Sequence, residues 1–204
     1  MTISQDISRR DFIKLSAKSA LSVGLLCIGL SKFGPGESKV YAADNNVTEV
    51  PVIWMQTGSC TGCSVSVLNS LSPNIQNILL DEVVPGKHLS LRFHATIMAA
   101  EGEKAIDVLK QTATDKGGYV LVVDGAISTK DGGIYCEIGE SNGNGITGLE
   151  HVKNLGKDAM AVIALGTCAA YGGIPAGAPN PTGAMGVDEA LQSLSITKDV
   201  IAKE

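Results

Sequence analysis

The most restrictive feature of this sequence is the run Tyr119–Val123, which is apolar throughout and rich in valine. Gly118 precedes the run and Asp124-Gly125 follows it, so it has the length of a strand rather than of a helix. A strand that does not alternate polar with apolar residues is buried on both faces, which is typical of a parallel sheet covered by helices. We therefore expect an α/β domain with residues 119–123 as a central strand.

Further strand patterns alternate with helical ones along the chain. Strands are predicted over residues 50–55, 89–94 and 159–165, and helices over residues 62–71, 101–112, 149–156 and 187–194. Strands joined by right-handed helical crossovers predict a doubly wound, flavodoxin-like parallel sheet. Ligands of such sheets lie beyond the carboxyl ends of the strands. Gly166 to Gly186 is rich in glycine and proline and predicts a long loop there.

The first part of the chain has the pattern of an export signal. Arg9 and Arg10 lie within Ser8–Lys14, which is similar to the twin-arginine motif, and an apolar run Leu21–Leu30 follows. Ten apolar positions are too few to span a bilayer, which disfavours an uncleaved anchor. We therefore predict a twin-arginine signal peptide over residues 1–43, a periplasmic location, and a domain over residues 44–204.

The charge of the remaining chain restricts its partners. Residues 1–42 contain six Lys or Arg and three Asp or Glu side chains, which leaves ten basic and eighteen acidic side chains, a net charge of −8. A surface of that sign repels phosphate backbones, so nucleic-acid binding is disfavoured. Beyond the signal, cysteines occur at positions 60, 63, 136 and 168.

Three of these cysteines follow predicted strands. Cys60 and Cys63 form a C-x-x-C pair at a strand-to-helix turn, where free N–H groups and the helix dipole favour thiolates. Cys168 follows the predicted strand 159–165, so we expect all three thiols in loops at the same edge of the sheet. Taken alone, a C-x-x-C pair fits a structural zinc site, a redox dithiol, an iron-sulfur ligand pair or a disulfide.

Four motifs, which follow one another along the chain, indicate one particular family of proteins. They occupy residues 54–66 (WMQTGSCTGCSVS), 131–136 (DGGIYC), 164–175 (ALGTCAAYGGIP) and 179–183 (PNPTG). Together they resemble the motifs of the small, electron-transferring subunit of periplasmic nickel-iron or nickel-iron-selenium hydrogenases. The resemblance covers nearly all of residues 1–198, including the twin-arginine signal.

The resemblance implies a function in electron transfer. It makes Cys60, Cys63 and Cys168 three of the four ligands of a proximal 4Fe-4S cluster. This cluster exchanges electrons with the active site of a separate large subunit and with further carriers, such as a cytochrome. The resemblance implies no hydrogenase activity of the chain alone, and membrane association only through the complex.

The end of the sequence departs from the family pattern. The fourth family ligand lies in a Gly-Cys-Pro-Pro segment after one more apolar strand, but this sequence continues with the charged segment Asp199–Glu204. We therefore expect a C-terminally truncated chain with an incomplete flavodoxin-like domain, a missing fourth ligand and no later iron-sulfur domain.

The remaining candidate residues have more ordinary interpretations. Cys136 does not match a ligand position of the family and is predicted to be a buried free thiol. The histidines match no ligand spacing and are expected to be structural or exposed; they are His88, His94 and His151. Gly62 and Gly177 stand where oxygen-tolerant relatives tend to carry extra cysteines.

Two other functions stay open at this point. One is a periplasmic thiol-disulfide oxidoreductase that uses Cys60 and Cys63. The other is an inactive truncated fragment whose sheet lacks its last strand.

Overall fold

The computed structural model of the chain describes residues 48–80, 86–114 and 118–203. These residues belong to one of the two units into which the chain divides, Asn45–Glu204. The export signal predicted over residues 1–43 lies outside the described residues. Within the described part of the chain, the longest helix has 13 residues, and no helix is long and apolar enough to cross a bilayer.

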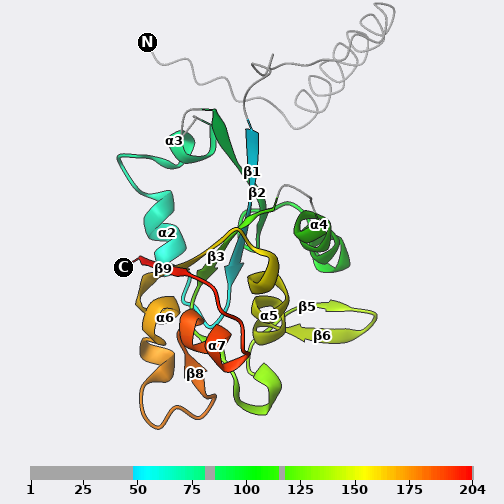
Figure 1. The fold of residues 1–204 in the computed structure, drawn as a ribbon, viewed down its shortest axis with the longest axis vertical. Helices are drawn as coiled ribbons and strands as arrows, with labels where there is room; N and C mark the ends of the chain where they lie inside the picture. The colour runs from blue at the N-terminus through cyan, green and yellow to red at the C-terminus, as the bar shows by residue number, and fades with distance from the viewer. Residues whose placement is uncertain (1–47, 81–85, 115–117, 204) are drawn as a thin grey trace, which may run out of the picture. The chain divides into compact units, whose positions relative to one another are not determined.

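The centre of the described unit is a parallel sheet of five strands in the order β2-β1-β3-β7-β9 (Figure 1). The strands are β1 (Thr48–Gln56), β2 (Lys87–His94), β3 (Val120–Asp124), β7 (Ala161–Leu165) and β9 (Val200–Lys203). Taken in chain order, their arrangement is 2-1-3-4-5, which is the flavodoxin-like order. The parallel sheet is therefore confirmed, with the predicted central strand in its middle.

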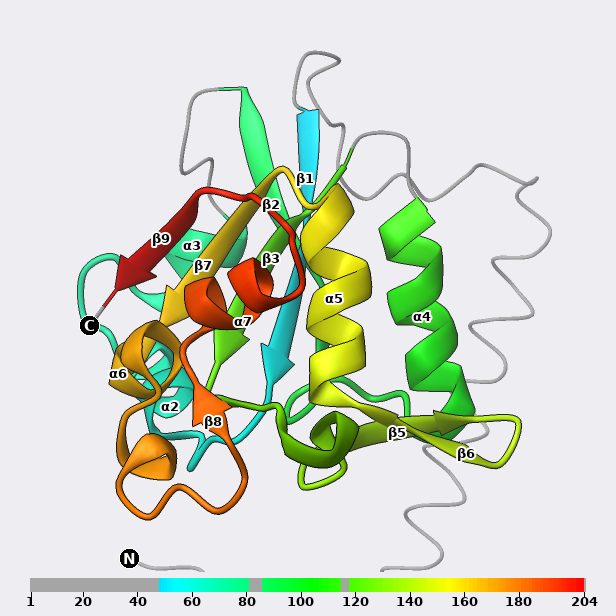
Figure 2. The same ribbon diagram turned by 60° about the horizontal axis from the view of Figure 1, so that its bottom comes forward.

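Helices cover both faces of this sheet. They are α2 (Gly62–Leu68), α3 (Ile75–Leu80), α4 (Gly102–Thr114), α5 (Gly148–Asp158), α6 (Gly166–Tyr171) and α7 (Val187–Ser193). Figure 2 shows α4, α5 and α7 in front of the sheet and α2 and α3 behind it. Four of these helices, α2, α4, α5 and α7, were predicted from the apolar periodicity, with boundaries within a few residues.

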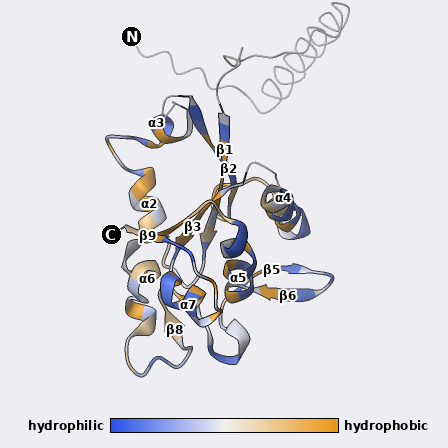
Figure 3. Cartoon of the chain, viewed as in Figure 1, coloured by the Kyte–Doolittle hydropathy of each residue, from blue (hydrophilic) through white to orange (hydrophobic). Residues whose placement is uncertain are grey.

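The two faces of the sheet are packed differently. On the α4–α5–α7 face, side chains such as Ile53, Leu121 and Val162 are fully buried. On the α2–α3 face, a cavity of about 270 Å³ with almost wholly apolar walls lies between the strands and the two helices. Trp54 of β1 and Val67 of α2 are among the residues that line it. Figure 3 shows the hydrophobic course of β3 and the hydrophilic surface of α4.

The predicted absence of a last strand is wrong. Residues Val200–Lys203 form β9, which pairs in parallel with β7 from Val162↔Val200 to Leu165↔Lys203. A strand at the edge of a sheet is paired on one side only and tolerates charged neighbours, so Asp199 and Lys203 do not prevent it. The sheet is therefore not left without a strand beside β7.

Two glycine-rich segments also contain more structure than predicted. The expected loop from Gly166 to Gly186 begins with α6 and contains the 3₁₀ turn η2 (Ile174–Ala176) and the short strand β8 (Ala184–Met185), which pairs with β4 (Ile127–Ser128). Between β4 and α5 lie the 3₁₀ turn η1 (Lys130–Gly133) and a hairpin of β5 (Glu137–Ser141) and β6 (Asn144–Thr147).

Candidate functional site

The three predicted site cysteines lie beyond the carboxyl ends of β1 and β7, the two strands that flank β3. Cys60 is exposed in the turn after β1, and Cys63 lies in the first turn of α2. Cys168 lies in the first turn of α6, so its predicted position in a loop is wrong, although α6 begins directly after β7. Because β1 and β7 run parallel, both cysteine-bearing segments leave the sheet at the same edge.

The shared edge of the sheet brings the three thiols near enough to affect the ionisation of Cys63. The charges of Cys168 and Cys60 both contribute to raising the pKa of the Cys63 thiol. The structure therefore brings Cys63 within electrostatic range of both other predicted site cysteines. Cys60, Cys63 and Cys168 are all free of disulfide bonds.

Glycines of the β7–α6 connection lie directly against two of the thiols. A Cβ atom placed on Gly166 would be 2.2 Å from Sγ of Cys63, and one on Gly173 would be 2.7 Å from Sγ of Cys168. Both glycines have positive φ angles, +81° and +50°, which L side chains rarely adopt. The close approach of backbone to sulfur therefore requires glycine at both positions.

A buried carboxylate holds the turn that carries Cys60 and Cys63. Asp124, at the end of β3, is 2% exposed. Its Oδ1 accepts a hydrogen bond from Oγ of Ser59 at 2.8 Å, and its Oδ2 accepts bonds from N and Oγ of Ser64 at 3.1 and 2.5 Å. Ser59 immediately precedes Cys60, and Ser64 immediately follows Cys63. One carboxylate therefore ties down both ends of the C-x-x-C turn.

The same turn is paired with the segment after β3. Gly58 and Ala126 form an antiparallel bridge, with N–H···O distances of 3.0 and 3.2 Å. A Cβ atom on Gly125 would be 2.7 Å from Cβ of Ser59, so the two segments approach more closely than a side chain allows. The cysteine turn is therefore fixed to the centre of the sheet by backbone as well as side-chain bonds.

The predicted thiolate character of Cys63 is wrong. Burial raises the pKa of the Cys63 thiol above its ordinary value, and the nearby Asp124 carboxylate, Cys168 and Cys60 raise it further. Desolvation and negative neighbours both disfavour a thiolate, and here they outweigh the N-terminus of the seven-residue helix α2. A cationic metal group would reverse this balance, because a coordinating thiol is deprotonated by the ion's charge.

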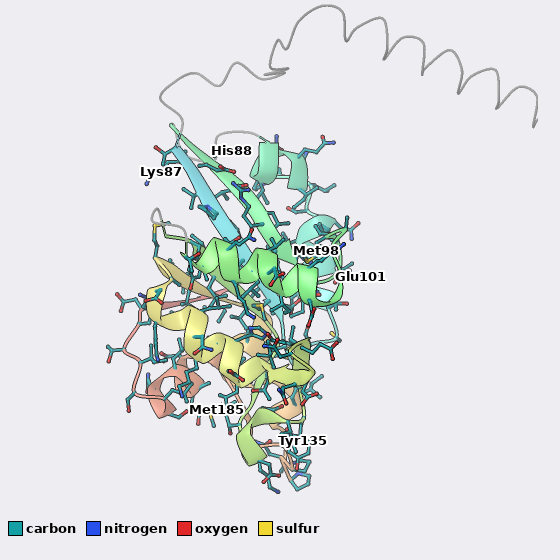
Figure 4. The ribbon with its side chains drawn as sticks, turned by 90° about the vertical axis from the view of Figure 1, so that its right-hand side faces the viewer. Lys87, His88, Met98, Glu101, Tyr135 and Met185 are labelled. Atoms are coloured by element: carbon teal, nitrogen blue, oxygen red, sulfur yellow. The ribbon has the colours of Figure 1, made fainter. Side chains whose placement is uncertain are left out.

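Cys136 is less buried than predicted, whereas His94 and His151 are buried and have contacts of a structural kind. Cys136 is a partly buried free thiol, and burial raises its pKa. His94 is 3% exposed with its ring 5.3 Å from the ring of Trp54, and Nε2 of the buried His151 lies 2.8 Å from O of Ile138. Figure 4 shows His88, at the amino end of β2, at the opposite end of the unit from Tyr135.

The donor set determines what this edge can bind. In the described part of the chain, no three or more His, Cys, Asp or Glu side chains are gathered closely enough to hold one metal ion. The three thiols are free and lie at the same edge of the sheet, which leaves each of them available to bind a different iron of a polynuclear cluster. Sequence reasoning missed Asp124, Ser59 and Ser64. The available signal was an acidic residue that directly ends a buried strand.

Known proteins are similar to this chain in both sequence and fold. The chain is 40% identical over 202 residues to the periplasmic [NiFeSe] hydrogenase small subunit of Desulfomicrobium baculatum, covering 93% of this chain and 60% of the relative. It is 37% identical over 191 residues to the periplasmic [NiFe] hydrogenase small subunit 1 of Nitratidesulfovibrio vulgaris, covering 93% and 54%. The chain thus spans little more than half the length of these curated relatives.

A solved structure and a family model agree with these relatives. The structure of a reduced, active form of the Ni-Fe-Se hydrogenase from Desulfomicrobium baculatum matches with a TM-score of 0.70 and 41% identity, over 76% of this chain and 55% of the other. The family model described as NADH ubiquinone oxidoreductase, 20 Kd subunit, matches residues 60–201, a segment that begins at the first site cysteine and includes Cys63 and Cys168. The chain therefore belongs to the NADH ubiquinone oxidoreductase 20 Kd subunit family.

Proposed function

We propose that this chain is the electron-transfer subunit of a nickel-iron or nickel-iron-selenium hydrogenase, with Cys60, Cys63 and Cys168 as ligands of a 4Fe-4S cluster. The observation that carries the proposal is the placement of three free cysteines at one sheet edge, with the backbone of the β7–α6 connection directly against Sγ of Cys63 and Cys168. The relatives named hydrogenase small subunits support the assignment to this enzyme class.

The residues present fit three of the four positions that such a cluster requires. Each of the three cysteines offers one sulfur atom, and 4Fe-4S clusters are usually held by four cysteine thiolates. Gly166 and Gly173 leave space beside the sulfur atoms of Cys63 and Cys168 that a side chain would fill. The described residues supply no fourth ligand in this proposal, because the remaining described cysteine, Cys136, does not match a ligand position of the family pattern.

The chain's own contribution is to hold and insulate the cluster. When bound, the cluster supplies one-electron transfer at a potential set by its charge, its hydrogen bonds and its burial. Asp124 and the serines beside the cysteines orient the first two thiols, and the glycines of the β7–α6 connection allow the backbone to approach them. Hydrogen chemistry belongs to a separate large subunit, so the chain alone has no hydrogenase activity.

The proposal extends to location and partners. Arg9 and Arg10 support export by the twin-arginine pathway, and two of the relatives are named periplasmic. We propose a heterodimer with a hydrogenase large subunit, which passes electrons to a carrier such as a cytochrome. The complex is periplasmic and meets the membrane only through its partners.

Iron and sulfide analysis of the anaerobically purified chain tests the cluster. We expect about four irons per chain, the content of one 4Fe-4S cluster. Replacing Cys60, Cys63 or Cys168 with serine should remove most of this iron, because the hard oxygen of serine is a poor ligand for the cluster. Cys136→Ser is the matched control and should retain it.

The same measurement separates the proposal from a thiol-disulfide oxidoreductase. A dithiol enzyme would contain no iron, and Cys60 and Cys63 would titrate as a redox pair while Cys168 was dispensable. Iron-free protein with an intact dithiol couple would overturn the proposed function.

A further inference from the structure

Helix α2 lacks a cap of its own at the end that carries Cys63. Its N-cap residue, Thr61, has a left-handed backbone with φ of 62° and makes no side-chain capping bond. The N–H of Ser64, in the first turn of α2, is instead bound by the Asp124 carboxylate, 60 positions away in the sequence. Asp124 of β3 therefore accepts the hydrogen bond of a free N–H group in the first turn of α2, which is usually the role of a local N-cap residue.

The hydroxyl groups of Ser64 and Ser59 both donate to this carboxylate, and that of Ser64 uses its full hydrogen-bonding capacity. Oγ of Ser64 donates its single proton to Asp124 and accepts from Nε1 of Trp54 at 2.9 Å and Nε2 of Gln56 at 3.3 Å. Oγ of Ser59 donates to Asp124 and accepts from N of Thr61 at 2.8 Å. One donor and two acceptor sites are the capacity of a serine hydroxyl, so the orientation of Ser64 is determined by its partners.

Packing alone does not define the position of α2. The cavity between the sheet and α2 is lined by Ser64, Val67 and Leu68 of this helix, so part of its inner face has no close-packed partner. The directional bonds to Asp124 therefore carry much of the restraint on Cys63. They also lie within the buried part of the structure, where hydrogen bonds to a charged group are strong.

We propose that Asp124 is a positioning residue, which fixes the Cys60–Cys63 turn in its ligating arrangement and places a fixed negative charge beside the cluster. Its buried carboxylate accepts three hydrogen bonds from Ser59 and Ser64, so its role in the proposal is to hold the turn rather than to bind iron. The statement about the cluster rests on the proposed function, whereas the statement about the turn does not. The bond from the Ser64 N–H places the carboxylate against the residue that follows Cys63 in the chain.

The charge is tested by the reduction potential of the cluster in the full chain. Asp124→Asn keeps the shape of the side chain and removes its charge. A negative charge stabilises the oxidised cluster, so we expect the variant to keep its iron and to have a more positive midpoint potential, with an altered EPR spectrum. The matched control is Asp188→Asn, which removes a charge from the exposed surface of α7 and should leave both unchanged. An unchanged midpoint potential in Asp124→Asn would overturn the proposal.

The turn is tested without iron by amide hydrogen exchange of the full chain. Asp124→Ala removes the acceptor of the Ser64 N–H, so we expect this amide to exchange about tenfold faster or more, while the amide of Val162 in β7 is unaffected. If Asp124→Ala loses its fold, the Val162 amide will report it. Asp124→Asn then gives the readout, with a smaller acceleration, because a neutral acceptor binds less strongly.

These experiments separate the two levels of the proposal. A wild-type chain without iron rejects the proposed function and leaves the exchange of Ser64 to decide the positioning role. An unchanged exchange rate of the Ser64 amide in a folded Asp124→Ala chain rejects the positioning role, whatever the iron content.

Discussion

Replacing Gly166 with alanine tests how closely the β7–α6 turn approaches the thiol of Cys63. The new Cβ would lie 2.2 Å from Sγ and 3.2 Å from Cβ of Cys63, at a φ of +81°. The left-handed backbone costs about 1–2 kcal/mol with a side chain present. Displacing the thiol adds about 1–3 kcal/mol, the usual cost of overpacking. We therefore expect Gly166→Ala to lower the free energy of unfolding by about 2–5 kcal/mol.

The chain provides a control for the backbone part of this cost. Gly132 has a similar φ of +73°, and a Cβ placed on it meets nothing within 4 Å. Gly132→Ala should therefore cost only the roughly 1–2 kcal/mol of the left-handed conformation. The difference between the two variants measures the contact with Cys63.

Urea unfolding of the iron-free chain gives both free energies by linear extrapolation. Adding Cys63→Ala to Gly166→Ala removes Sγ and should recover about 1–3 kcal/mol relative to the sum of the two single variants. The reasoning is refuted if Gly166→Ala costs no more than Gly132→Ala, or if the double variant shows no coupling. Either result would mean that the backbone does not press against the thiol.

Two buried groups give opposite pH dependences of stability. Burial, with a smaller contribution from Asp158, raises the pKa of Tyr119 to about 12. The unfolded chain therefore loses this proton first as the pH rises. About 2–3 kcal/mol of the free energy of unfolding should disappear between pH 10 and 12. Tyr119→Phe should lack this loss in urea titrations, and at pH 7 it should cost about 0.5–1.5 kcal/mol for the 2.6 Å bond to O of Leu155. Burial lowers the pKa of His151 despite opposing effects of its bond to Ile138 and of Glu150, while Lys110 lowers it further. The unfolded chain therefore binds this proton first, and stability should fall as the pH drops below about 6.5; a His151→Gln chain that shows the same fall would contradict this assignment.

The sheet could be predicted from the sequence because most of its strands have a recognisable local pattern of apolar residues. The apolar, β-branched run before Asp124 can be buried on both faces only at the centre of a parallel sheet, and the structure places it there. β9 escaped prediction because an edge strand needs fewer apolar residues, and Lys203 gives it a charged appearance. α6 was hidden by its glycines: Gly166 begins the helix at positive φ, and Gly172 caps it at φ of 84°.

The candidate site was predictable to the extent that it depends on topology. The three site cysteines, Cys60, Cys63 and Cys168, follow strands that run in the same direction. Their position at one edge of the sheet could therefore be expected from the sequence alone. The pKa of Cys63 could not, because it depends on burial and on Asp124, which is distant in the sequence. A helix N-terminus can be read from local sequence, whereas the charges packed against it are set by the tertiary fold.

The unequal packing of the two sheet faces has a mechanical consequence for the thiols. Hydrostatic pressure favours states with less internal void, and the void of about 270 Å³ lies under α2, on the side opposite α4, α5 and α7. Compression therefore acts on the packing beneath the helix that carries Cys63, whereas Ile53, Leu121 and Val162 on the other face are already fully buried. The position of the cysteine turn thus depends on the directions of its hydrogen bonds to Asp124 more than on the packing beneath α2.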